Sequence, residues 1–217
     1  AITATLPGAS SVAVSSPPEV TVREQRLPTD SVLAISIDGL NPNALRVLGR
    51  QGTPNLHAFM NSGASTLNAR TSYEMTVTLP NHTGMVTGRR IAAAKGGHGV
   101  TWNDDRKTPA TVQQAAKHDV ASVFTQVAGS GGSTALFASK TKFTLWQRSW
   151  PDAISHASVV EDNAVLVNQV VADLATTQRA FRFVHLSLPD VAGHASGFMS
   201  NPYLKAVRRV DTLVGSL

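Results

Sequence analysis

Apolar positions along the chain follow two different spacings, and these predict strands separated by helices. Short runs rich in branched apolar residues are typical of buried parallel strands and cover residues 31–37, 121–127, 134–138 and 181–187. Apolar residues at helical spacing or helix-start signals mark the remaining segments, which are residues 42–52, 53–63, 81–86, 111–118, 161–177 and 202–217. Strands alternating with helices predict an α/β fold with a mostly parallel central sheet flanked by helices.

The first 29 residues lack this pattern and are interpreted as an N-terminal tail, which leaves residues 30–217 as the folded part. The segment up to Pro18 is small, uncharged and rich in Ser, Ala and Pro. It is typical either of the remnant of a removed secretion signal or of a disordered terminus. No apolar run approaches the ~18 residues that a membrane span needs, so no transmembrane helix is predicted.

Composition narrows the chemistry. The 217 residues include 19 Lys and Arg against 14 Asp and Glu, a net charge of +5. Because the basic residues are scattered and aromatics make up only 6%, nucleic acid is not expected as the main partner, whereas a small anionic substrate fits the balance. The chain has no cysteine, which excludes a disulfide scaffold, a thiolate zinc site and a cysteine nucleophile.

Two acidic residues follow predicted strands. Asp38 ends the first strand and precedes a glycine, and Asp190 follows the late strand with His194 four residues further on. The carboxyl ends of parallel strands form the ligand-binding edge of such a sheet, so both acids are expected at one edge. A carboxylate and an imidazole together suit zinc or a similar divalent metal, although an ordinary turn and a loop with a stray histidine fit the same residues.

A threonine stands where a nucleophile would benefit from its surroundings. Thr78 precedes a Pro80-Asn81 helix-start signal, and a helix N-terminus provides a positive field that favours an alkoxide and binds anions. A threonine hydroxyl still needs a base or a metal to activate it. The same residues also begin ordinary helices. Lys140 and Lys142 are interpreted as surface charge, with contact to a distal phosphate as the alternative.

Six separated motifs, in order, resemble the alkaline phosphatase superfamily, in particular its nucleotide pyrophosphatase/phosphodiesterase branch, over about residues 31–217. The motifs are Asp38-Gly39, Thr53-Pro54-Asn55-Leu56, Thr78-Leu79-Pro80-Asn81-His82, Thr87-Gly88, His98-Gly99-Val100-Thr101-Trp102-Asn103, and Pro189-Asp190 with Gly193-His194. The resemblance implies an alkaline-phosphatase-like fold and a secreted or periplasmic enzyme that hydrolyses phosphodiester or pyrophosphate bonds of nucleotide-type substrates.

The resemblance also implies roles for individual residues. Thr78 would be the nucleophile and would bind one of two zinc ions with Asp38, whereas Asp190 and His194 would bind the other. Attack by Thr78 would give a phosphothreonine that water hydrolyses. Asn103 would be both catalytic and substrate-binding, because it would donate a hydrogen bond to a phosphate oxygen. Tyr73 is the candidate aromatic contact for a nucleobase.

Some family features are missing from the chain. The loop over residues 89–97 is longer and more basic than the family pattern, and the Asp-His-Gly motif and a further distal histidine that complete the zinc site do not occur. We therefore expect the chain to be the N-terminal portion of a catalytic domain whose C-terminal part is missing and would be its partner. The alternatives are an enzyme like phosphonoacetate hydrolase, and a catalytically silent anion-binding or interaction module.

Overall fold

The computed structural model describes residues 3–4, 12–13 and 31–217 and divides into two units, residues 1–30 and residues 31–217. In the first unit, strand β1 (Thr3–Ala4) pairs antiparallel with strand β2 (Val12–Ala13). The rest of the predicted tail lies outside the described residues. The second unit carries all the residues that the sequence nominates for chemistry, and it is described by itself below.

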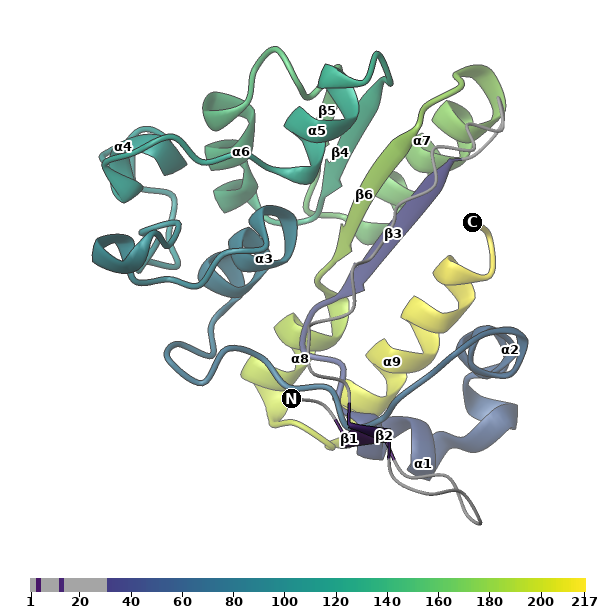
Figure 1. Cartoon of the computed structure of the whole chain (residues 1–217). Helices are drawn as coiled ribbons and strands as arrows, with labels where there is room; N and C mark the ends of the chain where they lie inside the picture. The colour runs from purple at the N-terminus through teal and green to yellow at the C-terminus, as the bar shows by residue number, and fades with distance from the viewer. Residues whose placement is uncertain (1–2, 5–11, 14–30) are drawn as a thin grey trace. The chain divides into compact units, whose positions relative to one another are not determined.

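A four-stranded parallel sheet forms the centre of this second unit (Figure 1). Its order is β3 (Val32–Ile37), β6 (Phe181–Leu186), β4 (Thr134–Ala138) and β5 (His156–Val159). Strand β6 pairs with β3 on one side and with β4 on the other, with Ser36 and Ala138 both opposite His185. The prediction of an α/β fold with a parallel sheet is therefore confirmed.

Helices flank the sheet on both faces. They are α1 (Pro42–Gly52), α2 (Pro54–Ser62), α3 (Thr78–Thr87), α4 (Val112–Ala116), α5 (Val123–Gly129), α6 (Thr144–Ser149), α7 (Asn163–Thr176), α8 (Leu188–Ser196) and α9 (Asn201–Val214), with two short 3₁₀ turns, η1 (Ala93–Lys95) and η2 (Thr141–Phe143). Among the described residues, no helix has the length and apolar character to cross a membrane.

Side chains alternate along the strands and so divide the core into two layers. In β6, Phe181 and Phe183 face a layer with Trp146 of α6, whereas Val184 and Leu186 face the opposite layer, which α7 and α9 complete. Every residue of β4 and β6 is buried, as expected for parallel strands covered on both faces. The sheet is therefore a rigid base on which the loops at its carboxyl edge rest.

The prediction of a strand over residues 121–127 is wrong, because this segment forms helix α5. Ser122 and Thr125 make a reciprocal capping box, which supplies partners for backbone amides at the helix start. Phe124 and Val127 then pack into the layer that contains Trp146. A short apolar run cannot by its spacing alone distinguish a strand from a buried helix, and here the cap decides.

Three further elements differ from the expectation. Strand β5, at one edge of the sheet, and helix α6 are not predicted from the sequence. The segment that begins at Leu188 was expected as a loop but forms helix α8, in which Pro189 occupies the first turn. Proline suits this position because the first helical residues need no intrahelical amide partner. Asp190 therefore lies in the first turn of a helix, where the helix dipole favours its negative charge.

Candidate active site

Asp38 lies directly after strand β3, at the carboxyl edge of the sheet, and its neighbour Gly39 lets helix α8 come close. Gly39 has a φ of 69°, and a Cβ atom at this position would lie only 2.6 Å from the Cα atom of Asp190. A side chain is therefore excluded twice, by the backbone conformation and by the close approach. Tyr203 fixes the same turn, because its hydroxyl donates to the Gly39 carbonyl and accepts from the Asn41 amide, both at 2.8 Å.

Thr78 is the first residue of helix α3, and its hydroxyl faces Asp38. Thr78 Oγ1 donates to Asp38 Oδ2 at 3.0 Å, and the side chain is buried. The loop before the helix is held by Asn81, whose Oδ1 accepts from the Ser72 amide at 2.8 Å. Asn81 therefore secures the entry to the helix instead of capping it. The hydroxyl lies within the positive field of a helix N-terminus and beside a carboxylate.

Lys140 follows strand β4 and lies between the two acids, so its interpretation as surface charge is wrong. Its Nζ atom lies 2.7 Å from Asp38 Oδ2, 2.6 Å from Asp190 Oδ2 and 3.3 Å from Thr78 Oγ1. The side chain is only 15% exposed. Three strands that end at one edge thus bring together Asp38, Lys140 and Asp190, which we call the cleft cluster.

Within the cleft cluster, the contacts favour the charged forms of Asp38 and Lys140. Burial alone raises the pKa of Asp38, but interactions with His185 and Lys140 outweigh it and keep the pKa well below its usual range. Burial likewise opposes the charge on Lys140, yet hydrogen bonds to Asp190 and Asp38 raise the pKa of its ammonium. Asp38 is therefore a carboxylate that accepts a proton poorly, and Lys140 is a cation at neutral pH.

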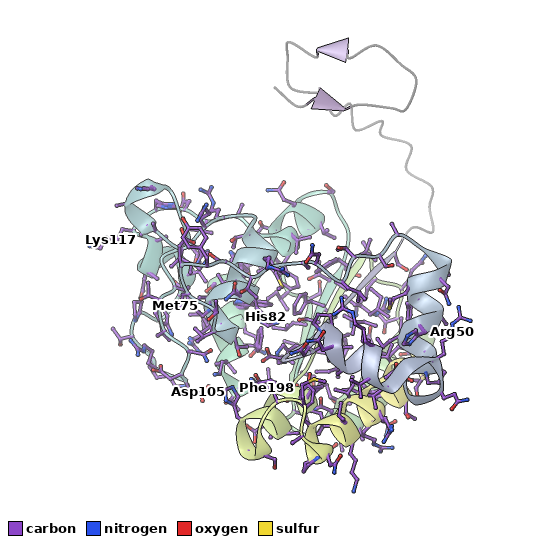
Figure 2. All side chains as sticks on the ribbon, turned by 90° about the horizontal axis from the view of Figure 1, so that it is seen from below. Arg50, Met75, His82, Asp105, Lys117 and Phe198 are labelled. Atoms are coloured by element: carbon purple, nitrogen blue, oxygen red, sulfur yellow. The ribbon has the colours of Figure 1, made fainter. Side chains whose placement is uncertain are left out.

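Two buried histidines lie beneath Asp38. Burial, together with the neighbouring His185, lowers the pKa of His82 to about 4, and burial lowers the pKa of His185 as well. Their rings meet edge to face with centroids 4.9 Å apart. Both are therefore neutral imidazoles at pH 7, which is the form that binds metals. Figure 2 places His82 in the interior, away from Arg50 and Lys117 at the periphery.

Asp38, His82 and His185 form a group that could hold a metal ion, since one ligand atom from each lies within 4.8 Å of the others. The two histidines differ in availability. His82 already contacts the Thr78 carbonyl and the Ser36 hydroxyl, at 2.8 and 2.7 Å. His185 Nε2 is buried without a hydrogen-bond partner and lies 3.4 Å from Asp38 Oδ2.

An orphaned imidazole nitrogen beside a carboxylate fits a divalent cation of the zinc type, because nitrogen and carboxylate oxygen are its usual ligands. A buried polar atom without a partner is otherwise costly. Among the described residues, Asp38 and His185 thus provide the ligand atoms best suited to a cation. His82 could bind the same cation only if its hydrogen bond to the Ser36 hydroxyl broke.

A cleft of about 510 Å³ opens above the cluster. It is lined by the nominated residues Asp38, Thr78, Asn103, Asp190 and His194. His194 is mostly exposed, and its Nε2 lies 3.4 Å from Asp190 Oδ1. The structure therefore gathers five of the six residues nominated from the sequence around one cavity, including both pairs assigned to a metal ion.

Asn103 reaches the cleft from a loop and is fixed by helix α3. Its Oδ1 accepts from the Leu79 amide at 2.9 Å, next to Thr78, and Lys142 donates to its carbonyl at 2.6 Å. No described residue accepts a hydrogen bond from its Nδ2, which is therefore available as a donor. Tyr73 is not part of this cleft; it is highly exposed and packs against Arg90 at 5.2 Å, in a separate hollow. Its assignment as a nucleobase contact stays a prediction.

The sequence patterns did not indicate Lys140 as a cluster member or His185 as a candidate cation ligand. A positional signal for Lys140 was available, since it stands two residues after the predicted strand 134–138, at the same edge as Asp38 and Asp190. For His185 the only available signal was weaker, a histidine inside an otherwise apolar strand.

Solved structures share this fold. Murine ectonucleotide pyrophosphatase/phosphodiesterase 5 aligns with a TM-score of 0.64 and 19% identity, over 86% of this chain and 51% of the murine chain. An inactive form of the murine protein in complex with AMP, and the human protein, match equally well over 50% of their chains. The chain thus spans about half the length of these proteins. Comparison with individually curated sequences returned no match.

A family model matches most of the chain. The model describes type I phosphodiesterase/nucleotide pyrophosphatase and covers residues 32–217, which include the cleft cluster, Thr78 and Asn103. The match also spans the whole parallel sheet. The chain therefore belongs to the type I phosphodiesterase/nucleotide pyrophosphatase family.

Proposed function

We propose that this protein is a metal-dependent hydrolase of phosphodiester or pyrophosphate bonds in nucleotide-type substrates, with Thr78 as the nucleophile. One observation carries the proposal: the Thr78 hydroxyl, at the start of α3, is hydrogen-bonded to Asp38 at the edge of a cleft that Asp190 and His194 also line. Membership in a phosphodiesterase family supports the reaction class. The AMP complex of the murine relative supports a nucleotide ligand.

Thr78 would attack phosphorus through Oγ1, forming a new P–O bond while the bond to the leaving oxygen breaks. The proton that the Thr78 hydroxyl loses passes through solvent to the leaving oxygen, which departs as an alcohol or a phosphate. Water then hydrolyses the phosphothreonine and restores the hydroxyl. Because the pKa of Asp38 is held low, Asp38 cannot act as a strong base toward Thr78. Asp38 would orient the hydroxyl, and the helix N-terminus would favour its negative charge.

Asn103 would stabilise the charge that develops on the phosphate. Its Oδ1 accepts from the Leu79 amide, so Nδ2 would be the atom that donates to a nonbridging phosphate oxygen. The hydrogen bond between Lys142 and the Asn103 carbonyl would keep this loop in place. The donor would thus be organised before the substrate binds.

The metal would be zinc, with two ions expected. Asp38 and Thr78 would hold one, with His185 as an added nitrogen ligand, and Asp190 and His194 would hold the other. When bound, zinc would supply Lewis acidity that lowers the pKa of the nucleophile and neutralises phosphate charge. We also propose that the protein acts in a secreted or periplasmic setting, as the family resemblance of its motifs implies.

The test is hydrolysis of bis(4-nitrophenyl) phosphate with and without zinc. We expect turnover that requires zinc, and Thr78→Ala lowering kcat by at least about 10³-fold because the nucleophile is removed. Thr87→Ala is the matched control: it removes a threonine hydroxyl from the other end of the same helix, where the hydroxyl bonds the Thr83 carbonyl. Full turnover in Thr78→Ala, or none with zinc in the unaltered protein, would refute the proposal.

A catalytically silent anion-binding module is the second candidate, and the observation that favours silence is the Lys140 ammonium, which occupies carboxylate oxygens of Asp38 and Asp190 that a metal would need. This candidate predicts binding of AMP without hydrolysis of any ester. Phosphonoacetate, offered as a second substrate beside bis(4-nitrophenyl) phosphate, separates a phosphonoacetate hydrolase from a phosphodiesterase.

A further inference from the structure

The ammonium of Lys140 is fully engaged by atoms that a metal ion would need. A lysine ammonium has three donors and no acceptor. Here three acceptors surround it: Asp38 Oδ2 at 2.7 Å, Asp190 Oδ2 at 2.6 Å and Thr78 Oγ1 at 3.3 Å. These oxygens include one from each of the two ligand pairs assigned above. A single internal cation therefore lies across both halves of the proposed metal site.

A metal ion and this ammonium compete for the same oxygens. Zinc binds carboxylate oxygen at about 2.0–2.2 Å, well inside the 2.6 to 2.7 Å at which the ammonium lies. Both cations would have to share Asp38 Oδ2 and Asp190 Oδ2 in a pocket where the three side chains are only 12 to 15% exposed. Water screens such a pocket poorly, so the two positive charges would repel each other strongly.

We propose that the chain binds its metal by exchange, in which Lys140 leaves Asp38 and Asp190 as a divalent cation takes its place. Lys140 is then a positioning residue. Without metal it neutralises the two acids and keeps them side by side, and in doing so it lowers the affinity for metal. The inference rests on the proposed metal-dependent function, and it concerns metal affinity rather than turnover.

Zinc titration by calorimetry of the whole chain tests the exchange. Lys140→Met keeps a long apolar stem but removes the ammonium, and we expect it to bind zinc at least about tenfold more tightly than the unaltered chain. Lys142→Met is the matched control, because it removes the same charge at a position two residues after Lys140. Lys142 donates to the Asn103 carbonyl and to neither acid. We expect its zinc affinity to stay within about threefold.

Thermal unfolding gives a second readout. Metal-free Lys140→Met leaves two buried carboxylates without their cation and should melt at a lower temperature than the unaltered chain. Saturating zinc should then raise its Tm by more than it raises that of the unaltered chain, because tighter binding stabilises more. Should the methionine variant fail to fold, Lys140→Gln keeps a hydrogen-bond donor without the charge, and the same tightening is expected.

The outcomes separate this inference from the proposed function. Equal or weaker zinc affinity in a folded Lys140 variant overturns the exchange and leaves metal dependence standing. Equal tightening in the Lys140 and Lys142 variants also overturns it, because it would show general charge removal instead of displacement. If no form of the chain binds zinc, the exchange and the proposed metal dependence fail together.

Discussion

Two clusters of buried opposite charges lie at opposite ends of the same strand. Near the end of β6 is the cleft cluster of Asp38, Asp190 and Lys140, and near its start is Arg182, paired with Asp173 of α7 at 2.7 Å. Arg179 also binds Asp173, at 2.7 Å, and we call these three residues the structural cluster. Both clusters are largely shielded from water, yet they differ in the balance and use of their charges.

The structural cluster has one acid and two bases, and both oxygens of its one carboxylate are paired within it. Both carboxylate oxygens of Asp173 accept from guanidinium groups, and Arg182 also donates to the Asp173 carbonyl at 3.2 Å. Burial raises the pKa of Asp173, but the two arginines outweigh it and lower that pKa. These contacts tie the end of α7 to the start of β6, a role in stability.

The cleft cluster has two acids and one base, and it borders a cavity. A hydroxyl lies 3.0 Å from Asp38, and an orphaned imidazole nitrogen lies 3.4 Å away. Surplus negative charge and ligand atoms without a partner do not stabilise the fold, but they are the properties that a cation site needs. Each cluster is out of balance by one charge, so the sign of the surplus charge and the presence of an unpartnered ligand atom, more than burial, distinguish the candidate site from the internal clamp.

Removing the central acid of the structural cluster should have the largest effect on stability. Asp173→Asn leaves two buried guanidinium groups without a counter-charge, and we expect the free energy of unfolding to fall by about 3 to 5 kcal/mol. Urea unfolding measures the change. Asp152→Asn, at an exposed turn, is the control and should stay within about 0.5 kcal/mol. A loss below about 1 kcal/mol in Asp173→Asn would break the comparison, since the cluster would then not be a clamp.

Acid should remove part of the same stability. Because the folded-state pKa of Asp173 lies below its unfolded value of about 3.9, the unfolded chain takes up the proton first. The contribution of the Asp173 charge to the free energy of unfolding is fully present above the unfolded pKa. It is lost as the pH falls through the lower pKa of the folded state. The gap in unfolding free energy between the unaltered chain and Asp173→Asn should therefore narrow between pH 5 and pH 3. Urea midpoints at three pH values measure it; a constant gap would show that Asp173 is not a charged partner.

Position relative to predicted strands accounts for what the sequence revealed of the site. Asp38 and Asp190 each follow a strand, so local patterns predicted that the two acids lie at one edge of the sheet. The place of Thr78 beside Asp38 followed from the family resemblance instead. The parallel sheet followed from the same alternation. These features depend on short segments whose spacing can be read directly.

What escaped prediction depends on contacts between distant segments. Lys140 meets Asp38 across 102 residues of sequence, and its position after a predicted strand indicates only the edge of the sheet, not the contact with the two acids. The orphaned nitrogen of His185 is visible only once the neighbouring strands are in register. Helix α5 was mistaken for a strand because its apolar run is too short for periodicity to decide.

The smallest effect on stability should come from the acid that the cleft cluster has in surplus. Asp190→Asn leaves Asp38 paired with Lys140 and removes the repulsion between two neighbouring carboxylates, which offsets the lost ion pair. We expect the free energy of unfolding, measured by urea, to change by less than about 1 kcal/mol, because the remaining charges balance. Zinc affinity should nevertheless fall, since a ligand is lost. A loss of unfolding free energy as large as that of Asp173→Asn would show that both clusters stabilise the fold. A small loss together with weaker zinc binding would show that Asp190 serves binding rather than folding.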